Sequence, residues 1–401
     1  MKNILIKTIA LSVVAGATLM AGGYKIPEVS TNGIALSAAN IAHAHSADAA
    51  YYNPANMVFM KDEQSVEADM IYIGLDPVNF KGSGTMAGVD IDAKSESFFI
   101  PSLNYVSAKA GNARIGVSIV VPGGLSKRWS DSPAVDKAKE FTLSVTEINP
   151  TFAIPINDKL AVAFGFRILY SKGIVENSSI ASRELNGDSV DFGYNLALAY
   201  KPTDSLEFGA TYRSNVSLTE KGDAKLYIAN AKVYDGGASV SVPLPAFLSL
   251  AAAYTFDTKT TLEFVYERNF WSAYKTLNFD YNSNIPAVLV PSMDMPIEKK
   301  WEDTNAFRLG ITQEFDQITA MAGIVYDETP ISDSKVSFEL PDSNSISVSL
   351  GGRYQIDKKW NIGLSTLYSM REKRDVTNSE LSGEFSNSNV LIVSAGVGYK
   401  F

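Results

Sequence analysis

The sequence has 401 residues with no cysteine and only two histidines, which leaves almost no ligands for a structural zinc site, a haem-attachment motif or a disulfide framework. Its 44 acidic and 35 basic residues give a net charge of −9, which disfavours nucleic acid as a partner because phosphate binding needs a positive surface. Mean hydropathy is close to zero, and beyond residue 21 no apolar run approaches the roughly 18 residues of a membrane-spanning helix, which excludes a helical membrane protein.

Residues 1–21 have the layout of a secretory signal peptide. Lys2 and Lys7 precede an apolar run at residues 9–19, and small residues follow from Ala21 onward. The apolar run is about half of the ~20 residues that a spanning helix needs, which argues against an uncleaved anchor. We expect cleavage after Ala21 and export of the mature chain.

Residues 22–62 form a second segment, whose composition disfavours β-strands. Its end, "DAAYYNPANMVFM" at residues 48–60, is rich in small residues and contains Pro54, which cannot donate a backbone hydrogen bond. The segment is too apolar and too poor in charge for a disordered periplasmic tail. Because a wide barrel encloses a lumen, we expect residues 22–62 to fold inside one as a plug.

From residue 63 onward, apolar and polar residues alternate with the period of a β-strand. In residues 159–172, one face carries large apolar side chains such as Phe164 and Phe166, while the other carries small or charged ones such as Ala163 and Arg167. The small, polar face could not pack a soluble core, so we expect the large side chains to face lipid. Comparable segments predict about fourteen strands, at residues 63–75, 95–108, 113–126, 140–156, 159–172, 188–201, 205–218, 238–256, 259–271, 302–315, 317–327, 344–357, 359–372 and 388–401.

The connections between these segments alternate in length. Short turns, such as residues 157–158 and 316–317, alternate with long polar loops near residues 76–94, 219–237, 272–301 and 373–387. The strands run to about 10 to 14 residues, whereas those of a soluble β-sandwich usually have about 5 to 6. We therefore predict an all-β fold, a 14-stranded antiparallel transmembrane β-barrel at residues 63–401 with an N-terminal hatch plugging its lumen.

The barrel must close, since an open sheet edge would leave unpaired backbone groups in hydrocarbon. We expect the last strand, "LIVSAGVGYKF", to pair with the first. Its aromatic end, Tyr399 and Phe401, resembles the signal that the outer-membrane assembly machinery reads.

The mature chain resembles the FadL-type family of outer-membrane transporters, which carry long-chain fatty acids and other hydrophobic compounds. The resemblance begins with Tyr24 after two glycines and includes an Asn-Pro-Ala motif at Asn53, Pro54 and Ala55. It continues in the family's order through "VPGGLSKRW", "ATYRSNVSL", "NAFRLGI", "AGIVYDETPIS" and "LPDSNSISVSLGGRYQID". It implies a 14-stranded barrel plugged by an N-terminal hatch.

The resemblance also implies a lateral passage at a kink in the third strand, through which a ligand leaves the lumen. In this sequence Pro122, Gly123 and Gly124 stand at that place. Proline removes a ladder hydrogen bond and glycines permit a bulge, so the residues agree with an interrupted wall. The alternative is that these three residues only begin the loop after the strand.

Relatives place basic residues near the end of the fifth strand and the start of the tenth, where they meet a fatty carboxylate. Here the first position matches Asn177, with Lys172 a few residues earlier, and the second offers Lys299 or Lys300; Arg213 is a further candidate. The mismatch leaves aromatic hydrocarbons, carried by some relatives, as an alternative ligand class.

The predicted external loop at residues 272–301 contains an apolar run between prolines, which includes Ile285, Val288 and Leu289. An exposed apolar patch usually marks a binding site, so this run could receive a hydrophobic ligand first. Packing over the barrel mouth is an equally good explanation.

No catalytic constellation is apparent, so we expect a transporter and not an enzyme, with no cofactor. His43 and His45, two apart on a helix, would point to different faces, which argues against a metal site. We expect Glu263 and Glu267 to form ion pairs inside the barrel with arginines such as Arg213, Arg268 or Arg308.

The expected setting is the bacterial outer membrane. The expected partners are hydrophobic small molecules, the bilayer with its lipopolysaccharide, and the assembly machinery. We expect a monomer. The alternative from another class is an enzyme or adhesin that uses the barrel as a scaffold.

Overall fold

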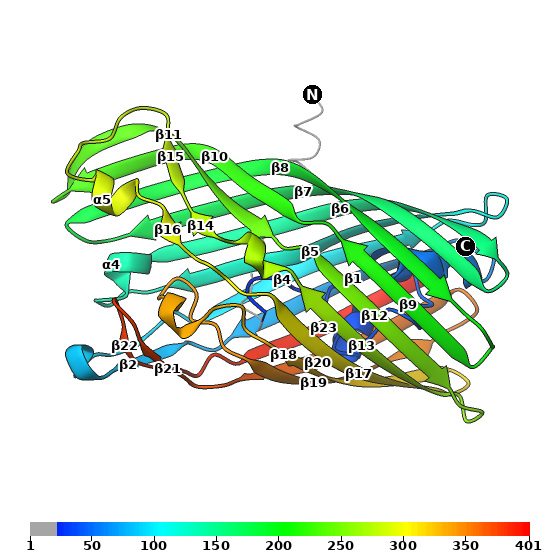
Figure 1. The fold of residues 1–401 in the computed structure, drawn as a ribbon. Coiled ribbons are helices and arrows are strands. Elements are labelled where there is room, and N and C mark those ends of the chain that lie inside the picture. Colours follow the sequence, from blue (N-terminus) through cyan, green and yellow to red (C-terminus); the bar gives the residue numbers. More distant parts are fainter. Residues whose placement is uncertain (1–21) are drawn as a thin grey trace.

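The computed structural model describes residues 22–401, so the predicted signal peptide lies outside the described residues. One large antiparallel sheet closes into a barrel (Figure 1). In chain order, this sheet contains β1 (Ser65–Leu75), β4 (Glu96–Val106), β5 (Arg114–Arg128), β6 (Glu140–Asn157), β7 (Leu160–Asn177), β8 (Ala181–Tyr200), β9 (Leu206–Arg213), β10 (Val216–Ile228), β11 (Ala231–Leu244), β12 (Phe247–Thr255), β13 (Thr260–Asn269), β15 (Phe279–Tyr281), β17 (Thr304–Glu314), β18 (Ile318–Asp327), β19 (Ser345–Gln355), β20 (Trp360–Arg371) and β23 (Val390–Lys400).

Three strands of the barrel are each divided into two successive segments: β9 and β10, β11 and β12, and β13 and β15. The 17 segments therefore make 14 barrel strands, as predicted. β23 pairs with β1 over the whole length of β1, from Ser65↔Lys400 to Leu75↔Val390. This pairing confirms the predicted closure and leaves the sheet without a free edge at that seam.

The two faces of the wall have the predicted polarity along the middle of the barrel. In β7, Phe164 and Phe166 point outward with 51% and 43% of their surface exposed, whereas Arg167 points inward and is buried. β8 repeats the pattern, with Phe192 outward and Asn195 inward. An outward apolar band of this kind is what lipid solvates.

The predicted loop at residues 219–237 is wrong, because these residues belong to β10 and β11 and only Ala229 and Asn230 form the turn. Here the polarity of the wall is reversed: Leu218 and Leu226 are buried inside, while Lys221 and Lys225 are exposed outside. This hairpin projects beyond the apolar band, where water solvates its outer face, so the outward apolar side chains used to find strands are missing.

The two ends of the barrel differ, as Figure 1 shows. The hairpin turns at one end are short, and the long loops gather at the other end around two small sheets. The larger one contains β2 (Asn79–Gly82), β3 (Asp90–Asp92), β21 (Arg374–Thr377) and β22 (Ser382–Ser386), and the smaller one contains β14 (Thr276–Leu277) and β16 (Ile297–Glu298).

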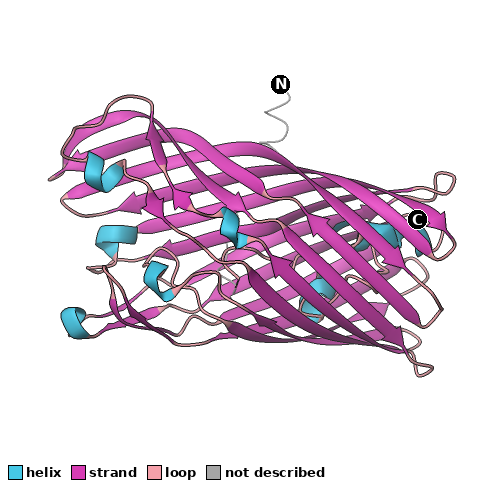
Figure 2. Ribbon diagram, in the orientation of Figure 1, coloured by secondary structure: helices cyan, strands magenta, loops and turns pink. Residues whose placement is uncertain are grey.

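All helices of the described chain are short (Figure 2). None of them is long and apolar enough to cross a membrane. They are α2 (Thr31–Ala35), α3 (Ala49–Tyr52), η1 (Pro54–Phe59), η2 (Gly84–Met86), α4 (Val135–Ala138), η3 (Trp271–Ala273), α5 (Val290–Met293) and η4 (Asp333–Lys335).

Residues 22–62, called here the N-terminal segment, contact the inner face of the wall from several sides. α2 contacts β18, β19, β20 and β23, whereas η1 contacts β5 to β8. A glycine of the wall allows the segment to approach closely, since a Cβ at Gly323 of β18 would lie 2.3 Å from the backbone of Leu36. Nearly all side chains from Tyr24 to Val58 are buried.

Candidate functional site

The barrel wall is interrupted between β4 and β5. The two strands pair only from Leu103↔Ile119 to Val106↔Gly116. Among the described residues, no ladder pair joins residues 96–102 of β4 to residues 120–127 of β5, although β4 pairs with β1 throughout. At the far end of this interval, the side chains of the two strands meet, since Arg128 Nε donates to Glu96 Oε1 (2.7 Å). We call residues 96–102 and 120–127 the wall gap.

The gap begins where β5 bends inward. The register of β5 against β6 shifts between Val120 and Gly123, so that the strand carries a bulge at Pro122. From Val120 to Lys127 every side chain is buried, whereas earlier residues of β5 alternate between the two faces. The predicted set of Pro122, Gly123 and Gly124 therefore lies within the strand and not in the loop after it.

The N-terminal segment occupies the hydrogen-bonding edge that β4 leaves free. The N–H of Gly124 donates to the carbonyl of Tyr24 (2.8 Å), and the N–H of Ile26 donates to the carbonyl of Pro122 (2.9 Å). These bonds replace ladder bonds of β5 with bonds to a segment that is not part of the wall. A Cβ at Gly123 would lie 2.9 Å from Leu244 Cδ1 and 3.2 Å from the carbonyl oxygen of Tyr24, so a larger residue would crowd this docking.

A small cavity lies at the gap; its lining is mainly aliphatic, with Glu28 and Ser102 as its polar residues. Ile100 of β4 and Val121 of β5 face it from the two sides of the gap, and Ile26 closes it from the N-terminal segment. A hydrophobic molecule that passes the gap would therefore meet aliphatic side chains on both sides.

A second cavity, of about 490 Å³, lies on the long-loop side of Tyr24. Its lining is mostly apolar, with Leu125, Val240 and Trp301 among its residues, and Lys299 is the one cation there. Lys299 is buried and forms an ion pair with Glu339. Burial lowers the pKa of the Lys299 ammonium to about 8.

Tyr24 is the residue of the N-terminal segment that lines this cavity. Its ring packs against three aromatic residues, with centroid distances of 4.8 Å to Trp271, 5.6 Å to Trp301 and 6.4 Å to Tyr274. Its hydroxyl donates to the carbonyl of Pro243. The sequence analysis did not single out Trp271 and Trp301, because the long-range packing of their rings on Tyr24 leaves no pattern in the sequence. Trp271 lies in η3, beyond the end of β13, whereas residue 271 was predicted to end a strand.

A wide groove of about 1950 Å³ opens among the long loops. It shares Phe141, Val175 and Lys299 with the cavity beside Tyr24, so the two spaces adjoin. Met293, Met295 and Pro296 add an apolar lining. The groove therefore gives an amphiphile a path from the loop end to Tyr24.

The predicted apolar run beside this groove is divided between core and surface. Ile285 and Leu289 are buried in the core under the loops, whereas Val288 is 73% exposed. Asn177 does line the groove, but its amide is engaged: Nδ2 donates to the carbonyls of Asp136 (3.1 Å) and Ala181 (3.0 Å).

The other predicted cations lie away from the cavity beside Tyr24. Lys172 is on the outward face of β7, because the inward positions there are Ser171 and Gly173. Lys300 is exposed and pairs with Glu298 (2.9 Å). The residues that face the interior are instead Ser171 and Gly173, beside Lys172, and Lys299, beside Lys300.

Arg213 is buried against the N-terminal segment. It pairs with Glu147, lies over the ring of Tyr51 at 4.3 Å, and donates to the Tyr51 carbonyl (3.3 Å). It lines a separate cavity of about 500 Å³ between the segment and the wall, together with Lys25 and Glu267. Arg213 thus joins the N-terminal segment to the barrel.

The expected ion pairs inside the barrel are only partly correct. Glu267 pairs with Arg308 (3.2 Å), as expected, and also with Lys25, which the sequence analysis missed. Glu263 instead accepts three backbone hydrogen bonds, from the N–H groups of residues 41 (2.6 Å), 42 (2.7 Å) and 43 (3.1 Å). Arg268 contacts Asp303 at 3.5 Å, near the surface.

The Asn-Pro-Ala motif lies within the N-terminal segment, where Asn53 caps the start of η1. Asn53 Oδ1 accepts from the N–H of Ala55 (3.1 Å), and Pro54 opens η1, where a missing N–H costs nothing. Asn53 Nδ2 donates to the carbonyls of Ile41 (2.9 Å) and, in β8, Leu198 (3.1 Å). The motif thus ties the segment both to itself and to the wall.

Comparisons with known proteins agree with this architecture. A family model described as "Outer membrane protein transport protein (OMPP1/FadL/TodX)" matches residues 11–401. A long-chain fatty acid transport protein of Escherichia coli O6:H1 is 22% identical over 91% of this chain and 90% of its own length. Outer membrane protein P1 of Haemophilus influenzae is 22% identical over 97% of this chain and 99% of its own length.

Solved structures show the same fold. A Pseudomonas aeruginosa FadL homologue superposes with a TM-score of 0.82 at 18% identity, covering 96% of this chain and 99% of its own. The Pseudomonas putida toluene transporter TodX gives a TM-score of 0.72 at 18% identity, covering 96% and 99% of the two chains.

Proposed function

We propose that this chain, which belongs to the OMPP1/FadL/TodX family of outer-membrane transport proteins, lets hydrophobic molecules diffuse passively into the outer membrane through the wall gap. The observation that carries the proposal is the interruption between residues 96–102 and 120–127, lined by Ile100 and Val121. A closed ladder would offer a ligand in the lumen no exit to the bilayer. At this gap the ligand would leave sideways.

The proposed route starts in the groove among the long loops and continues into the cavity beside Tyr24. From there the ligand must pass the N-terminal segment, since Tyr24 lines the inner cavity and Ile26 lines the cavity at the gap. Residues 22–62 would thus act as a hatch. Displacing Tyr24 to Ile26 from β5 would join the two cavities.

Long-chain fatty acids are the ligand class that we favour. Lys299 lies in a mainly apolar cavity and would turn from Glu339 to a ligand carboxylate, while the chain fills the apolar part. Aromatic hydrocarbons are the second candidate, because the apolar lining needs no carboxylate and a toluene transporter has the same fold.

The proposal includes a monomer in the outer membrane, in contact with lipopolysaccharide and inserted by the assembly machinery. We propose no catalytic role. An assay of lipid hydrolysis by the purified protein tests the enzyme alternative, and turnover that depends on a lumenal residue would overturn our reading.

The test of transport compares uptake of labelled oleate and of toluene in cells whose other transporters for these compounds are deleted. We expect the protein to restore uptake of at least one of them. Equal uptake with and without the protein, with the barrel present in the membrane, would contradict the proposal.

A further inference from the structure

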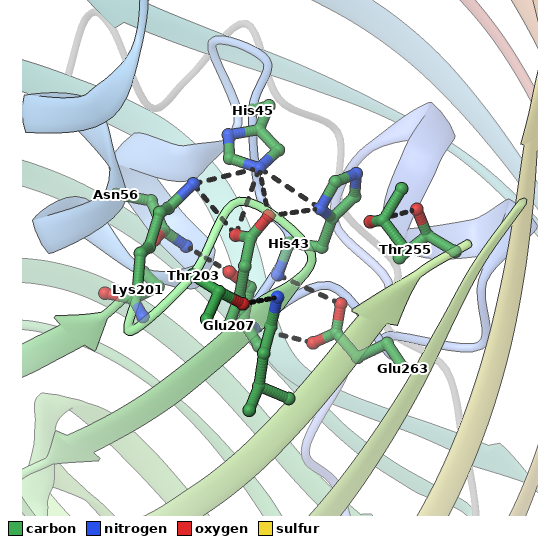
Figure 3. A network of polar contacts seen from close by, with 12 residues as sticks. His43, His45, Asn56, Lys201, Thr203, Glu207, Thr255 and Glu263 are labelled. Carbon is green, nitrogen blue, oxygen red and sulfur yellow. Dashed lines mark hydrogen bonds and ion pairs between the residues drawn. The ribbon is translucent and has the colours of Figure 1, made fainter. Parts of the chain in front are cut away.

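Both histidines of the chain meet a wall carboxylate at the short-turn end of the barrel (Figure 3). His43 Nδ1 lies 2.9 Å from Glu207 Oε1, and His45 Nε2 lies 3.2 Å from Glu207 and 3.2 Å from His43 Nδ1. The expectation that the two rings point apart is wrong. Residues 43 and 45 lie outside any helix, and their rings pack edge to face with centroids 4.3 Å apart.

We propose that His43, His45 and Glu207 bind a divalent transition-metal cation of the zinc type, which links the N-terminal segment to strand β9. Two imidazole nitrogens and one carboxylate oxygen are an established ligand set for Zn²⁺. Ligand bonds of about 2.0–2.2 Å in a tetrahedron place the ligand atoms about 3.3–3.5 Å apart. The separations of 2.9 to 3.2 Å need only a small outward adjustment.

The backbone that carries His43 is fixed before any cation arrives. Glu263 accepts the N–H groups of residues 41 to 43 from one side. From the other side, Asn56 Nδ2 donates to the carbonyls of Ile41 (3.0 Å) and Ala42 (3.1 Å). These bonds fix the backbone from which the His43 side chain projects towards Glu207.

The site already attracts a cationic group. Lys201 Nζ lies 2.9 Å from Glu207 Oε2 and 3.3 Å from His45 Nε2. Glu207 is buried, and its Oε2 is the atom that pairs with this ammonium. A metal ion would take the place of the ammonium, because Lys201 follows the end of β8 and can turn away into the open mouth of the barrel.

A cation also has access to these residues. His43 and His45 line a wide opening of about 1580 Å³ at the short-turn end, which faces the periplasm in outer-membrane barrels. A bound ion would add bonds between the N-terminal segment and the wall without occupying the cavity beside Tyr24. It would hold the segment in place independently of the hydrophobic ligand.

The test is Zn²⁺ titration of the full purified chain in detergent, by calorimetry and by competition with a chromophoric chelator. We expect one saturable site per chain. His45→Gln and Glu207→Gln should each weaken binding at least about tenfold. Lys201→Gln should strengthen it about tenfold, because it removes the competing charge. Glu314→Gln, at the same mouth, is the matched control and should bind as the parent does.

Co²⁺ provides a second readout, since a tetrahedral site with nitrogen ligands gives a characteristic visible spectrum. His45 is partly exposed, so His45→Gln should not disturb folding, which heat-modifiable migration in SDS verifies. Absence of a saturable Zn²⁺ site would overturn the proposal. Equal affinity in the parent and in the double variant His43→Gln, His45→Gln would overturn it as well, because the binding would then lie elsewhere.

Discussion

The backbone N–H of Gly124 donates a 2.8 Å hydrogen bond to the carbonyl of Tyr24, 100 residues earlier in the chain. The part of β5 that does not pair with β4 is thus completed by the N-terminal segment. The backbone of Tyr24 bonds to β5, and its ring lines the inner cavity. Any movement of Tyr24 that opens the proposed route must therefore also break a hydrogen bond of β5. The route and the wall are therefore coupled at this point.

Closing the wall gap should stop uptake without stopping binding. The sequence contains no cysteine, so Ile100→Cys with Val121→Cys introduces only two thiols, which face the same small cavity from β4 and β5. After treatment with a short bifunctional thiol reagent, we expect uptake of labelled oleate to fall at least about tenfold while the purified protein still binds it. The treated Ile100→Cys single variant is the control. Unchanged uptake by fully cross-linked protein would exclude a lateral exit here.

Enlarging Gly323 should loosen the hatch. A side chain at this inward position would clash with the backbone of Leu36, to which even a Cβ would lie at 2.3 Å. We expect Gly323→Leu to displace this part of the hatch and to raise single-channel conductance in planar bilayers. Ile324→Leu, on the outward face of the same strand, should leave conductance as it is. Equal conductance of the two variants would argue that the hatch does not limit passage.

Binding of an anionic amphiphile should depend on pH through Lys299. Burial lowers the pKa of this ammonium from 10.5 to about 8, so the side chain is charged below about pH 8 and becomes neutral above it. The attraction to an anionic head group should therefore be present at pH 7 and be lost as the pH rises to 9.

The probe for this test is dodecanesulfonate, whose head group stays ionised throughout. We expect its affinity to fall several-fold between pH 7 and pH 9, and Lys299→Met to make the fall smaller. Glu220, a second titratable group that lines this cavity, should account for the dependence that remains. Toluene, which has no charge, serves as the control ligand. A flat profile for the sulfonate in the parent protein would show that Lys299 does not meet the head group.

Removing the Glu263 carboxylate should free the bend that carries His43. Glu263→Ala leaves three backbone N–H groups without their acceptor, and each unsatisfied buried group costs about 1–3 kcal/mol. We expect amide hydrogen exchange at residues 41–43 to become at least about tenfold faster while the barrel stays heat-modifiable. Glu314→Gln is the control for a lost carboxylate at the same end. Unchanged exchange would mean that other contacts hold the bend.

Much of the barrel follows from the sequence, because lipid and lumen impose opposite demands on alternate residues. Phe164 and Phe166 could be assigned to lipid, and Arg167 to the interior, by alternation alone. The same reasoning failed at residues 219–237, where water lies outside the wall. Lys221 and Lys225 there are outward strand residues, which a rule that seeks outward apolar side chains reads as a loop.

The sequence by itself thus determined the barrel and its closure, since both depend on the alternation of residues and on backbone groups that hydrocarbon cannot satisfy. The place of the kink was expected from the resemblance to the FadL-type family, with which Pro122, Gly123 and Gly124 agree. Only the tertiary structure decided which groups meet inside. Tyr24 bonds to Gly124, and His43 meets Glu207, because a closed barrel brings residues far apart in sequence to one lumen. The spacing of residues along the chain does not encode such distances. For the same reason, only the tertiary structure shows that Lys299, and not Lys300, lines the inner cavity.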